Sequence, residues 1–172
     1  MKKKLNNYIE IKNNNSKKFI IHGYASVFDI KDQHNDIIVK GAFVESICSL
    51  ERIKLLWQHD TSKPIGNITY LEEDNYGLRV EALITDKTQL GRETIELISQ
   101  KIINGLSIGF IVEKAKYDNQ RVRIINKVNL LEISLVTFPA HSDAKINYDY
   151  QDSLYKLESS LEEAFLTLKQ MR

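Results

Sequence analysis

The chain has little of several residue types, and each shortage excludes a class of protein. One cysteine, Cys48, stands among 172 residues, which excludes an intramolecular disulfide and a cysteine-rich zinc site. No stretch approaches the roughly 18 consecutive apolar residues of a membrane-spanning helix. The 24 basic and 23 acidic residues give a net charge of +1, whereas dedicated nucleic-acid-binding proteins are usually strongly basic. We therefore expect one globular domain in a reducing compartment, with neither a membrane nor a nucleic acid as its partner.

Signatures of metal and cofactor sites are also missing. The four histidines are not spaced as pairs of zinc ligands, and no glycine-rich phosphate loop with its lysine is present. The acidic segment 29–36 lacks the central glycine and terminal glutamate of a calcium-binding EF-hand. We expect this segment to be a polar turn, and we expect no cofactor. The remaining chemistry has to come from serine, histidine and carboxylate side chains.

The pattern of apolar residues predicts a mainly β domain with few helices. A helix is expected over 86–102, with Asp86 as its cap and Asn104-Gly105 as its end. A shorter helix is expected over 41–47. The expected strands are 19–28, 52–59, 65–71, 78–85, 107–115, 121–128 and 130–138, with a hairpin connection at 72–77. Many strands around one long helix favour an antiparallel sheet or a barrel.

The two ends of the chain have patterns of their own. Residues 1–18 hold six lysines and one acid, which is typical either of a solvated basic tail or of an arm that docks on an acidic partner. They lack the apolar segment of a signal peptide. Residues 152–172 place apolar side chains at alternating spacings of three and four, the pattern of a heptad helix. That helix is expected either to pack on its own domain, 19–151, or to form a dimer or partner interface.

Three residues form a candidate catalytic constellation. Ser107 lies in Gly105-Leu106-Ser107-Ile108-Gly109, which has the G-x-S-x-G spacing of a nucleophile elbow, but the expected helix precedes the serine and the strand follows it. This reversed order argues against an α/β-hydrolase. His59 ends the apolar strand Leu55-Leu56-Trp57-Gln58-His59. Its position in the sequence alone is compatible with a structural role as well as a catalytic one.

Glu132 interrupts an apolar strand. Alternation places Leu131, Ile133 and Leu135 on one face and Glu132, Ser134 and Val136 on the other. If the second face is covered, a buried carboxylate needs a partner, and a histidine suits it. Ser107 would then be the nucleophile, His59 its base, and Glu132 the group that orients the imidazole.

Several short segments, taken in order, give the chain a recognisable resemblance. They are Gly23-Tyr24-Ala25-Ser26-Val27-Phe28, Lys40-Gly41-Ala42-Phe43, Leu56-Trp57-Gln58-His59-Asp60, Pro64-Ile65-Gly66, Gly91-Arg92-Glu93, Gly105-Leu106-Ser107-Ile108-Gly109-Phe110, Leu131-Glu132-Ile133-Ser134-Leu135-Val136-Thr137 and Pro139-Ala140. With them the chain resembles, from about Gly23 to Ala144, the prohead (capsid-maturation) proteases of tailed bacteriophages, distant relatives of the herpesvirus assemblin proteases.

The resemblance implies a serine endopeptidase on a closed, mainly antiparallel β-barrel flanked by helices. It assigns the family's histidine to His59 and its serine to Ser107. The third member of the herpesvirus triad is a second histidine, whereas the corresponding position here is Glu132. His141 is the alternative candidate for this third role.

The same resemblance implies a function and partners. The family cuts the scaffold, or the scaffold-like segment of the major capsid protein, and often itself, inside the assembling procapsid in the bacterial cytoplasm. A homo-oligomer through the heptad segment 152–172 is expected. The alternative from another class is a non-catalytic assembly or scaffolding component that keeps the fold. A nucleic-acid-binding barrel would depend on the lysine-rich N-terminus alone.

Overall fold

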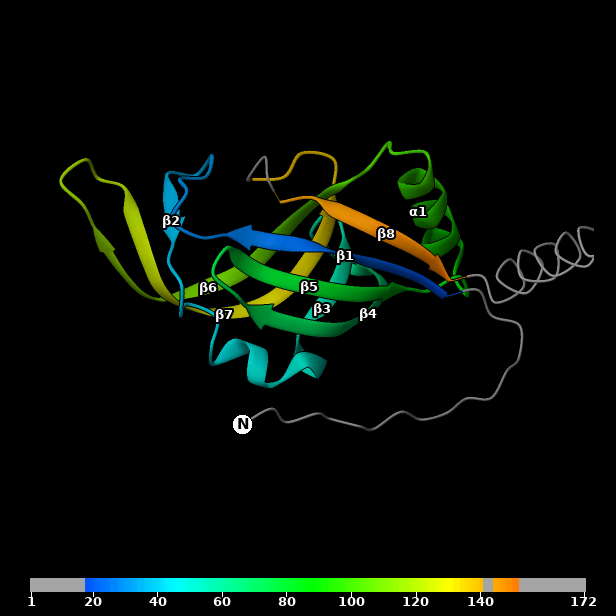
Figure 1. Ribbon diagram of the computed structural model, residues 1–172, viewed down its shortest axis with the longest axis horizontal. Helices are drawn as coiled ribbons and strands as arrows, with labels where there is room; N and C mark the ends of the chain where they lie inside the picture. The colour runs from blue at the N-terminus through cyan, green and yellow to red at the C-terminus, as the bar shows by residue number, and fades with distance from the viewer. Residues whose placement is uncertain (1–17, 141–143, 152–172) are drawn as a thin grey trace, which may run out of the picture. The chain divides into compact units, whose positions relative to one another are not determined.

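The computed structural model describes residues 18–140 and 144–151, and the structural statements below concern these residues. They form eight strands, one α-helix and two short 3₁₀ helices (Figure 1). In chain order these are β1 (Lys18–Val27), β2 (Asp36–Ile38), η1 (Ser46–Cys48), η2 (Leu50–Arg52), β3 (Lys54–Trp57), β4 (Asp60–Glu73), β5 (Gly77–Ile84), α1 (Gln89–Ser99), β6 (Gly105–Tyr117), β7 (Arg123–Val136) and β8 (Ile146–Gln151). The mainly β class predicted from the sequence is confirmed.

All eight strands belong to one sheet, with the order β2-β7-β3-β4-β5-β1-β8 and with β6 paired to β7. The sheet is not closed into a barrel, so the expected closed barrel is wrong. The start of β6 and the residues that lead into β8 meet at an isolated bridge between Gly105 and Lys145, where the Leu106 amide donates to the Ala144 carbonyl and the Ile146 amide donates to the Asn104 carbonyl. Beyond this bridge β8 continues along β1, whereas β6 runs away with β7 into a hairpin that projects from the opposite end of the sheet (Figure 1). The two edges therefore separate before a ladder can form between them.

The strand directions are mixed rather than antiparallel throughout. β2 and β3 both run parallel to β7 and pair with different parts of the same edge of it. The opposite edge of β7 pairs with β6 in antiparallel register along its whole length. β7 is therefore the strand on which β3 and β6 meet, and this arrangement positions the candidate site.

Several expected element boundaries differ from those observed. The two strands expected over 121–128 and 130–138 form one strand, β7, because Asn129 between them continues the ladder and pairs with Ile111 of β6. The expected helix 86–102 is shorter and begins after Thr88, whose side chain accepts a hydrogen bond from the Gly91 amide at 3.0 Å. Asp86 is therefore not the cap. The helix expected over 41–47 is a series of turns that ends in η1.

Two elements were not predicted from the sequence. β2 lies at the end of the segment expected to be a turn, and β8 lies between the last expected strand and the expected heptad helix. The expected basic tail 1–18, apart from Lys18, and the heptad helix 152–172 lie outside the described residues.

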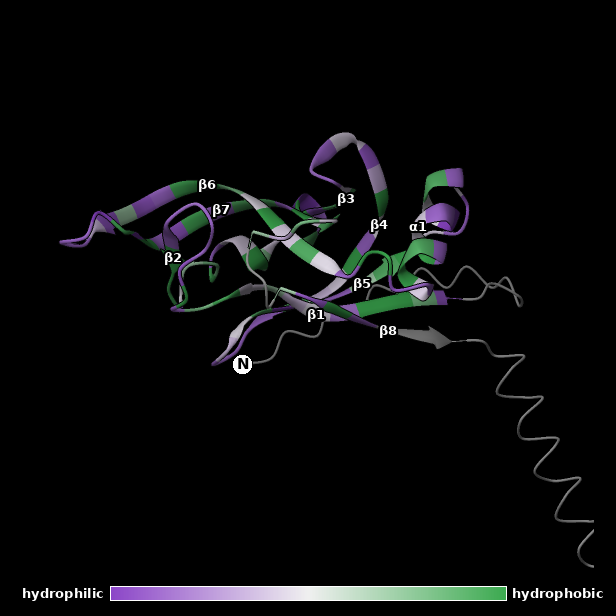
Figure 2. Ribbon diagram, turned by 90° about the horizontal axis from the view of Figure 1, so that it is seen from above, coloured by the Kyte–Doolittle hydropathy of each residue, from purple (hydrophilic) through white to green (hydrophobic). Residues whose placement is uncertain are grey.

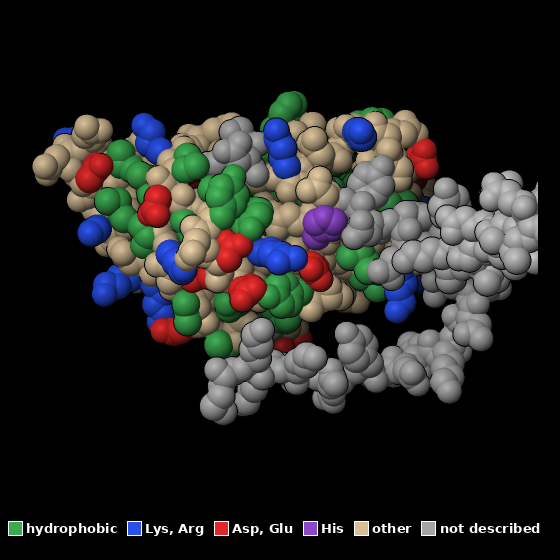
Figure 3. Space-filling model, viewed as in Figure 1, with side chains coloured by type: hydrophobic (Ala, Val, Ile, Leu, Met, Phe, Trp, Pro, Cys, Tyr) green, Lys and Arg blue, Asp and Glu red, His purple; other side chains and the backbone are tan. Residues whose placement is uncertain are grey.

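The hydrophobic core lies between the curved strands and the segments that cover them. Its largest fully buried side chains are Phe19, Ile21, Phe43, Leu55, Ile65, Leu78, Val80, Ile98, Leu106, Ile125, Ile133 and Leu135. Figure 2 shows apolar residues along the central parts of the strands and hydrophilic residues at the tip of the β6–β7 hairpin. On the face drawn in Figure 3, acidic and basic side chains are interspersed. No helix among the described residues is long and apolar enough to cross a membrane.

The Lys40-Gly41-Ala42-Phe43 segment has a structural role. The carboxylate of Glu73 accepts hydrogen bonds from the amides of Gly41 (2.9 Å) and Phe43 (2.7 Å). Gly41 has φ +96°, in the region that favours glycine. These contacts fix the turn so that the Phe43 ring is fully buried.

Candidate active site

The three residues predicted from the sequence lie on or directly beside three adjacent strands. On β7, Ser134 pairs with Leu56 of β3 on one edge and with Ser107 of β6 on the other. Glu132 is two residues before Ser134 on β7 and pairs with Gly109 of β6. Because side chains two residues apart on a strand share a face, the Glu132 and Ser134 side chains lie on the same face of β7. His59 lies two residues after the end of β3, in the turn that leads to β4, so all three predicted residues meet around β7.

The turn that carries His59 has an unusual backbone. Gln58 and His59 connect β3 to β4, with φ values of 53° and 59°. Positive φ at both central residues is what a type I′ hairpin turn requires, but Asn and Gly adopt it more readily than Gln and His. Three groups of β7 and its end hold the turn. The amide of Gln58 donates to the Leu135 carbonyl (2.9 Å), the amide of His59 donates to Ser134 Oγ (3.0 Å), and the Gln58 side chain bonds Thr137. Strain of this kind is typical of functional sites.

The His59 imidazole is paired with the Glu132 carboxylate. His59 Nδ1 lies 2.5 Å from Glu132 Oε1. Glu132 is only 8% exposed, so its face of β7 is covered, as the predicted partnership with a histidine requires. The hydrogen bond to Glu132 raises the pKa of His59, and partial burial of the imidazole opposes this rise. The carboxylate therefore favours the protonated imidazole.

The expected alternation of side chains along β7 holds on one side of Glu132 only. Ile133 and Leu135 are fully buried, as a shared core face requires, but Leu131 is 44% exposed. The register between β6 and β7 shifts between the Gly109–Glu132 and Phe110–Leu130 pairs, so Leu131 is the extra residue of a bulge. The placement of Leu131 on the core face was therefore wrong.

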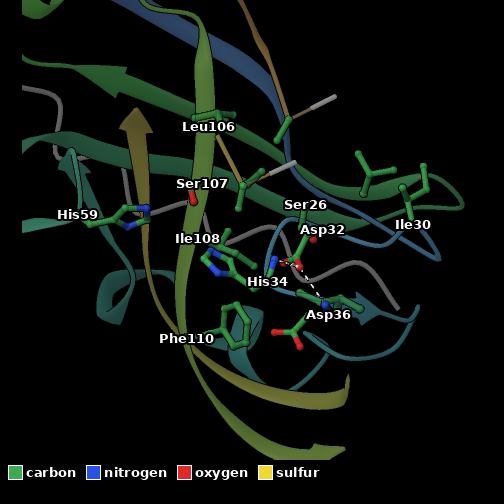
Figure 4. Close-up of a pocket in the computed structure, with 15 residues that line it drawn as sticks. Ser26, Ile30, Asp32, His34, Asp36, His59, Leu106, Ser107, Ile108 and Phe110 are labelled. Atoms are coloured by element: carbon green, nitrogen blue, oxygen red, sulfur yellow. Dashed lines mark hydrogen bonds between the residues drawn. The ribbon is translucent and has the colours of Figure 1, made fainter. Parts of the chain in front are cut away.

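Ser107 and His59 line the same cleft, which has a volume of about 140 Å³. Ser107 is 8% exposed, and Figure 4 shows its hydroxyl on the side of β6 that faces the His59 imidazole. The hydrogen bonds found within the described residues do not include a direct one between these two side chains. In proteins without bound substrate such bonds are often long and shorten only in the complex.

The two glycines of the G-x-S-x-G segment are required by close packing against neighbouring residues. A Cβ on Gly109 would collide with Glu132 Oε1 and would lie 2.9 Å from Glu132 Cγ and Cδ. A Cβ on Gly105 would lie 2.7 Å from the Val136 carbonyl oxygen and 2.9 Å from Pro139 Cδ. Ser107 itself lies inside β6. The segment is therefore not a nucleophile elbow, and the glycine at 109 makes room for the Glu132 carboxylate.

The far side of the cleft is formed by the segment that leads into β2. Asp32 Oδ1 accepts hydrogen bonds from the amides of His34 (2.8 Å) and Asp36 (2.9 Å), as Figure 4 shows. Asp36 is 4% exposed and forms a bidentate ion pair with Arg123, with Nε donating to Oδ1 at 2.7 Å. This pair raises the pKa of Arg123 and fixes β2 against β7. Up to Asn35 the segment is the polar turn that the sequence predicts, and Asp36 begins β2.

The rest of the cleft is largely apolar. Its other lining residues are Ala25, Ser26, Val27, Ile30, Ile38, Leu106, Ile108, Phe110, Ala140 and Ala144. No group of three or more His, Cys, Asp or Glu that could hold a metal ion occurs within 18–140 and 144–151. A small apolar cleft beside a serine and a histidine offers space for a peptide side chain next to the Ser107 hydroxyl.

Sequence reasoning missed three residues of the site. Ser134 accepts the His59 amide, Gln58 precedes His59 in the turn and bonds Thr137, and His34 lines the cleft. Ser134 follows Glu132 by two residues on the same face of one strand, and this spacing is the signal in the sequence that places it beside Glu132. His141, the alternative to Glu132, lies outside the described residues.

Comparison with solved structures defines the class of fold. The KSHV protease, solved in complex with a hexapeptide phosphonate inhibitor, has a TM-score of 0.53 and 13% identity, over 78% of this chain and 66% of that protein. The bacteriophage T4 capsid assembly protease has a TM-score of 0.54 and 12% identity, over 68% of this chain and 81% of that protein. The chain thus has a fold similar to that of the herpesvirus proteases, as expected.

Sequence relatives define the family. The family model for caudovirus prohead serine proteases matches residues 7–158, so the chain belongs to this family, and the resemblance inferred from the sequence is confirmed. The prohead protease of Enterobacteria phage HK97 is 34% identical over 134 residues, which are 76% of this chain. The prohead protease of Escherichia phage T5 is 29% identical, over 83% of this chain and 70% of that protein. A capsid polyprotein of Pseudomonas phage PAJU2 is 29% identical, over 80% of this chain and 21% of the polyprotein. The chain spans 60% of the length of the HK97 relative.

Proposed function

We propose that the chain is a serine endopeptidase that cleaves the scaffold, or the scaffold-like segment of the major capsid protein, inside the procapsid. One observation carries this proposal: Ser107 and His59 line one cleft, and Glu132 is bonded to Nδ1 of that same histidine. Membership of the prohead serine protease family supports it.

The geometry supports acyl transfer through Ser107. With Nδ1 directed at the Glu132 carboxylate, Nε2 is the imidazole nitrogen left to accept the proton of the Ser107 hydroxyl. The Ser107 oxygen attacks the scissile carbonyl carbon, and the protonated His59 then gives its proton to the leaving amine. Water hydrolyses the Ser107 ester in the second half of the reaction, with His59 again acting as base. Glu132 orients the imidazole throughout and stabilises its charged form.

The names of the relatives support a capsid substrate. Two of them are prohead proteases, and one is a capsid polyprotein with a segment similar to this chain. For this chain we propose the major capsid protein, or a separate scaffold protein, as partner and substrate, and the chain itself as a further substrate. The proposed homo-oligomer through residues 152–172 stays a prediction.

The pH dependence of cleavage tests this function. Only neutral His59 accepts the serine proton, and Glu132 raises the pKa of His59 above the ordinary value for a histidine. The rate is therefore expected to increase by about tenfold per pH unit below this raised pKa and to level off above it. The measurement is the initial rate of capsid-precursor cleavage from about pH 5 to about pH 9, followed by gel electrophoresis and product mass. A precursor that stays intact at every pH would argue against the proposed function, and a rate that does not change with pH would argue against His59 as the base.

A further inference from the structure

Ser134 forms hydrogen bonds with both members of the His59–Glu132 pair. Its hydroxyl donates to Glu132 Oε2 at 2.7 Å and accepts the main-chain N–H of His59 at 3.0 Å. The other carboxylate oxygen, Oε1, lies 2.5 Å from His59 Nδ1. Main chain, hydroxyl, carboxylate and imidazole therefore form a closed ring of three contacts. Such a ring fixes the direction of the imidazole as well as the position of the turn that carries it.

The burial of Ser134 indicates that these two bonds are the reason for a hydroxyl at this position. All five residues from Glu132 to Val136 are buried, and Ser134 is 0% exposed. An apolar side chain would ordinarily occupy such a position on a central strand. A buried hydroxyl is tolerated when both its donor and its acceptor capacities are used, as they are here.

The His59 turn needs the support that Ser134 supplies. His59 and Gln58 both have positive φ, a conformation that persists in residues other than glycine only when the surroundings hold it. Ser134 is 75 residues from His59 in the sequence, so its hydrogen bond ties the turn to a distant strand. Ser134 also pairs directly with Ser107 across β6 and β7. The same residue thus sets the position of the histidine and lies opposite the nucleophile.

We propose that Ser134 is a positioning residue that holds the His59 imidazole and the Glu132 carboxylate in the geometry needed to activate Ser107. The proposal rests on the proposed function, because it assigns Ser134 a part in the same reaction. Ser134 acts through His59 and Glu132 and does not itself touch the reacting atoms.

Ser46, the first residue of η1, provides a control because its hydroxyl also bonds to β7. Its hydroxyl donates to the Val128 carbonyl (2.7 Å) and accepts the Leu130 amide (3.0 Å), both on β7. Like the Ser134 hydroxyl, it therefore makes one hydrogen bond as donor and one as acceptor. Unlike the hydrogen bonds of Ser134, these two involve neither His59 nor Glu132. Loss of either hydroxyl removes two hydrogen bonds, but only loss of the Ser134 hydroxyl removes bonds to His59 and Glu132.

The experiment compares Ser134→Ala, Ser134→Thr and Ser46→Ala in the full chain. Three quantities are measured: kcat and KM for capsid-precursor cleavage, the pKa of His59 from an NMR titration of its ring, and the midpoint of thermal unfolding. Without the Ser134 hydroxyl, the 2.5 Å contact to Glu132 is less populated, so the rise in the His59 pKa is reduced. Ser134→Ala is expected to lower kcat by about 10- to 100-fold with KM unchanged, and to shift the His59 pKa downward. Ser134→Thr keeps the hydroxyl and is expected to retain most of the wild-type kcat and most of the rise in the His59 pKa. Ser46→Ala is expected to change only the unfolding midpoint.

Each other outcome has a definite reading. If Ser134→Ala lowers only the unfolding midpoint, as Ser46→Ala does, Ser134 is merely structural and the proposal is overturned. If the wild-type chain cleaves nothing, the proposed function fails, but a lower His59 pKa in Ser134→Ala still supports positioning and an unchanged one still overturns it. If Ser134→Ala does not fold, Ser134→Cys fills the position with a slightly larger side chain that is only a weak donor. Reduced kcat in a folded Ser134→Cys variant supports the proposal, and full activity overturns it.

Discussion

Replacing Ser107 with alanine is expected to lower kcat for capsid-precursor cleavage by about a thousandfold or more. The reason is that in the proposed mechanism the hydroxyl oxygen forms the acyl bond, and neither His59 nor Glu132 can replace it as nucleophile at that position. Ser107 is 8% exposed, and the change removes only its hydroxyl oxygen without adding any atom that would have to be packed. The fold should therefore be retained. Initial rates with purified wild-type and variant chains, and their thermal unfolding curves, measure both effects.

Ser26 supplies the control for this substitution. It lines the same cleft from β1 and is 7% exposed, close to the exposure of Ser107. Ser26→Ala should therefore disturb the cleft to a similar degree while leaving the nucleophile in place, and most of the activity should remain. Processing of the precursor by Ser107→Ala at the wild-type rate would show that Ser107 is not the nucleophile.

Replacing Glu132 with glutamine is expected to lower kcat by about ten-thousandfold, the effect that loss of the orienting carboxylate has in other serine proteases. An amide can donate a hydrogen bond to Nδ1 and so favour the tautomer with its proton on Nε2, which cannot accept the proton of Ser107. Because Glu132 raises the pKa of His59, the remaining activity should also persist to lower pH than in the wild type. Rate profiles of the two chains against pH measure both the loss and the direction of the shift.

Two further variants make the Glu132 result specific. Glu113→Gln removes a carboxylate from the exposed part of β6, where it pairs with Lys127 at 3.1 Å, and should leave cleavage unchanged. His141→Ala tests the other candidate for the third role. If His141→Ala abolishes cleavage and Glu132→Gln does not, the orienting role belongs to His141.

Local sequence patterns predicted the strands better than they predicted the sheet. The apolar alternation of β1 and the β4–β5 hairpin is a local signal, and these elements appear close to where they were expected. Closure of the sheet depends on whether β6 and β8 stay together beyond the bridge at Gly105, which no local pattern records. The parallel pairing of β2 and β3 with β7 is a long-range property of the same kind.

The candidate site was predicted as residue types but not as a network. Ser107 was identified by the glycines on either side of it and Glu132 by its interruption of an apolar strand. The contacts that join His59 to Glu132 and to Ser134 span 73 and 75 residues of sequence. The positive φ values of Gln58 and His59 could not be predicted from the sequence either, because these residue types rarely form such a turn.

Labelling with a fluorophosphonate reagent tests most directly whether His59 activates Ser107. The wild-type chain and a His59→Ala variant are incubated with the reagent, digested, and mapped by mass spectrometry. The site geometry predicts one phosphonyl adduct, on the peptide that contains Ser107, in the wild type, and labelling slower by about a hundredfold or more in His59→Ala. An adduct on a different serine, or equal labelling rates for the two chains, would contradict the assignment of Ser107 and His59 as nucleophile and base.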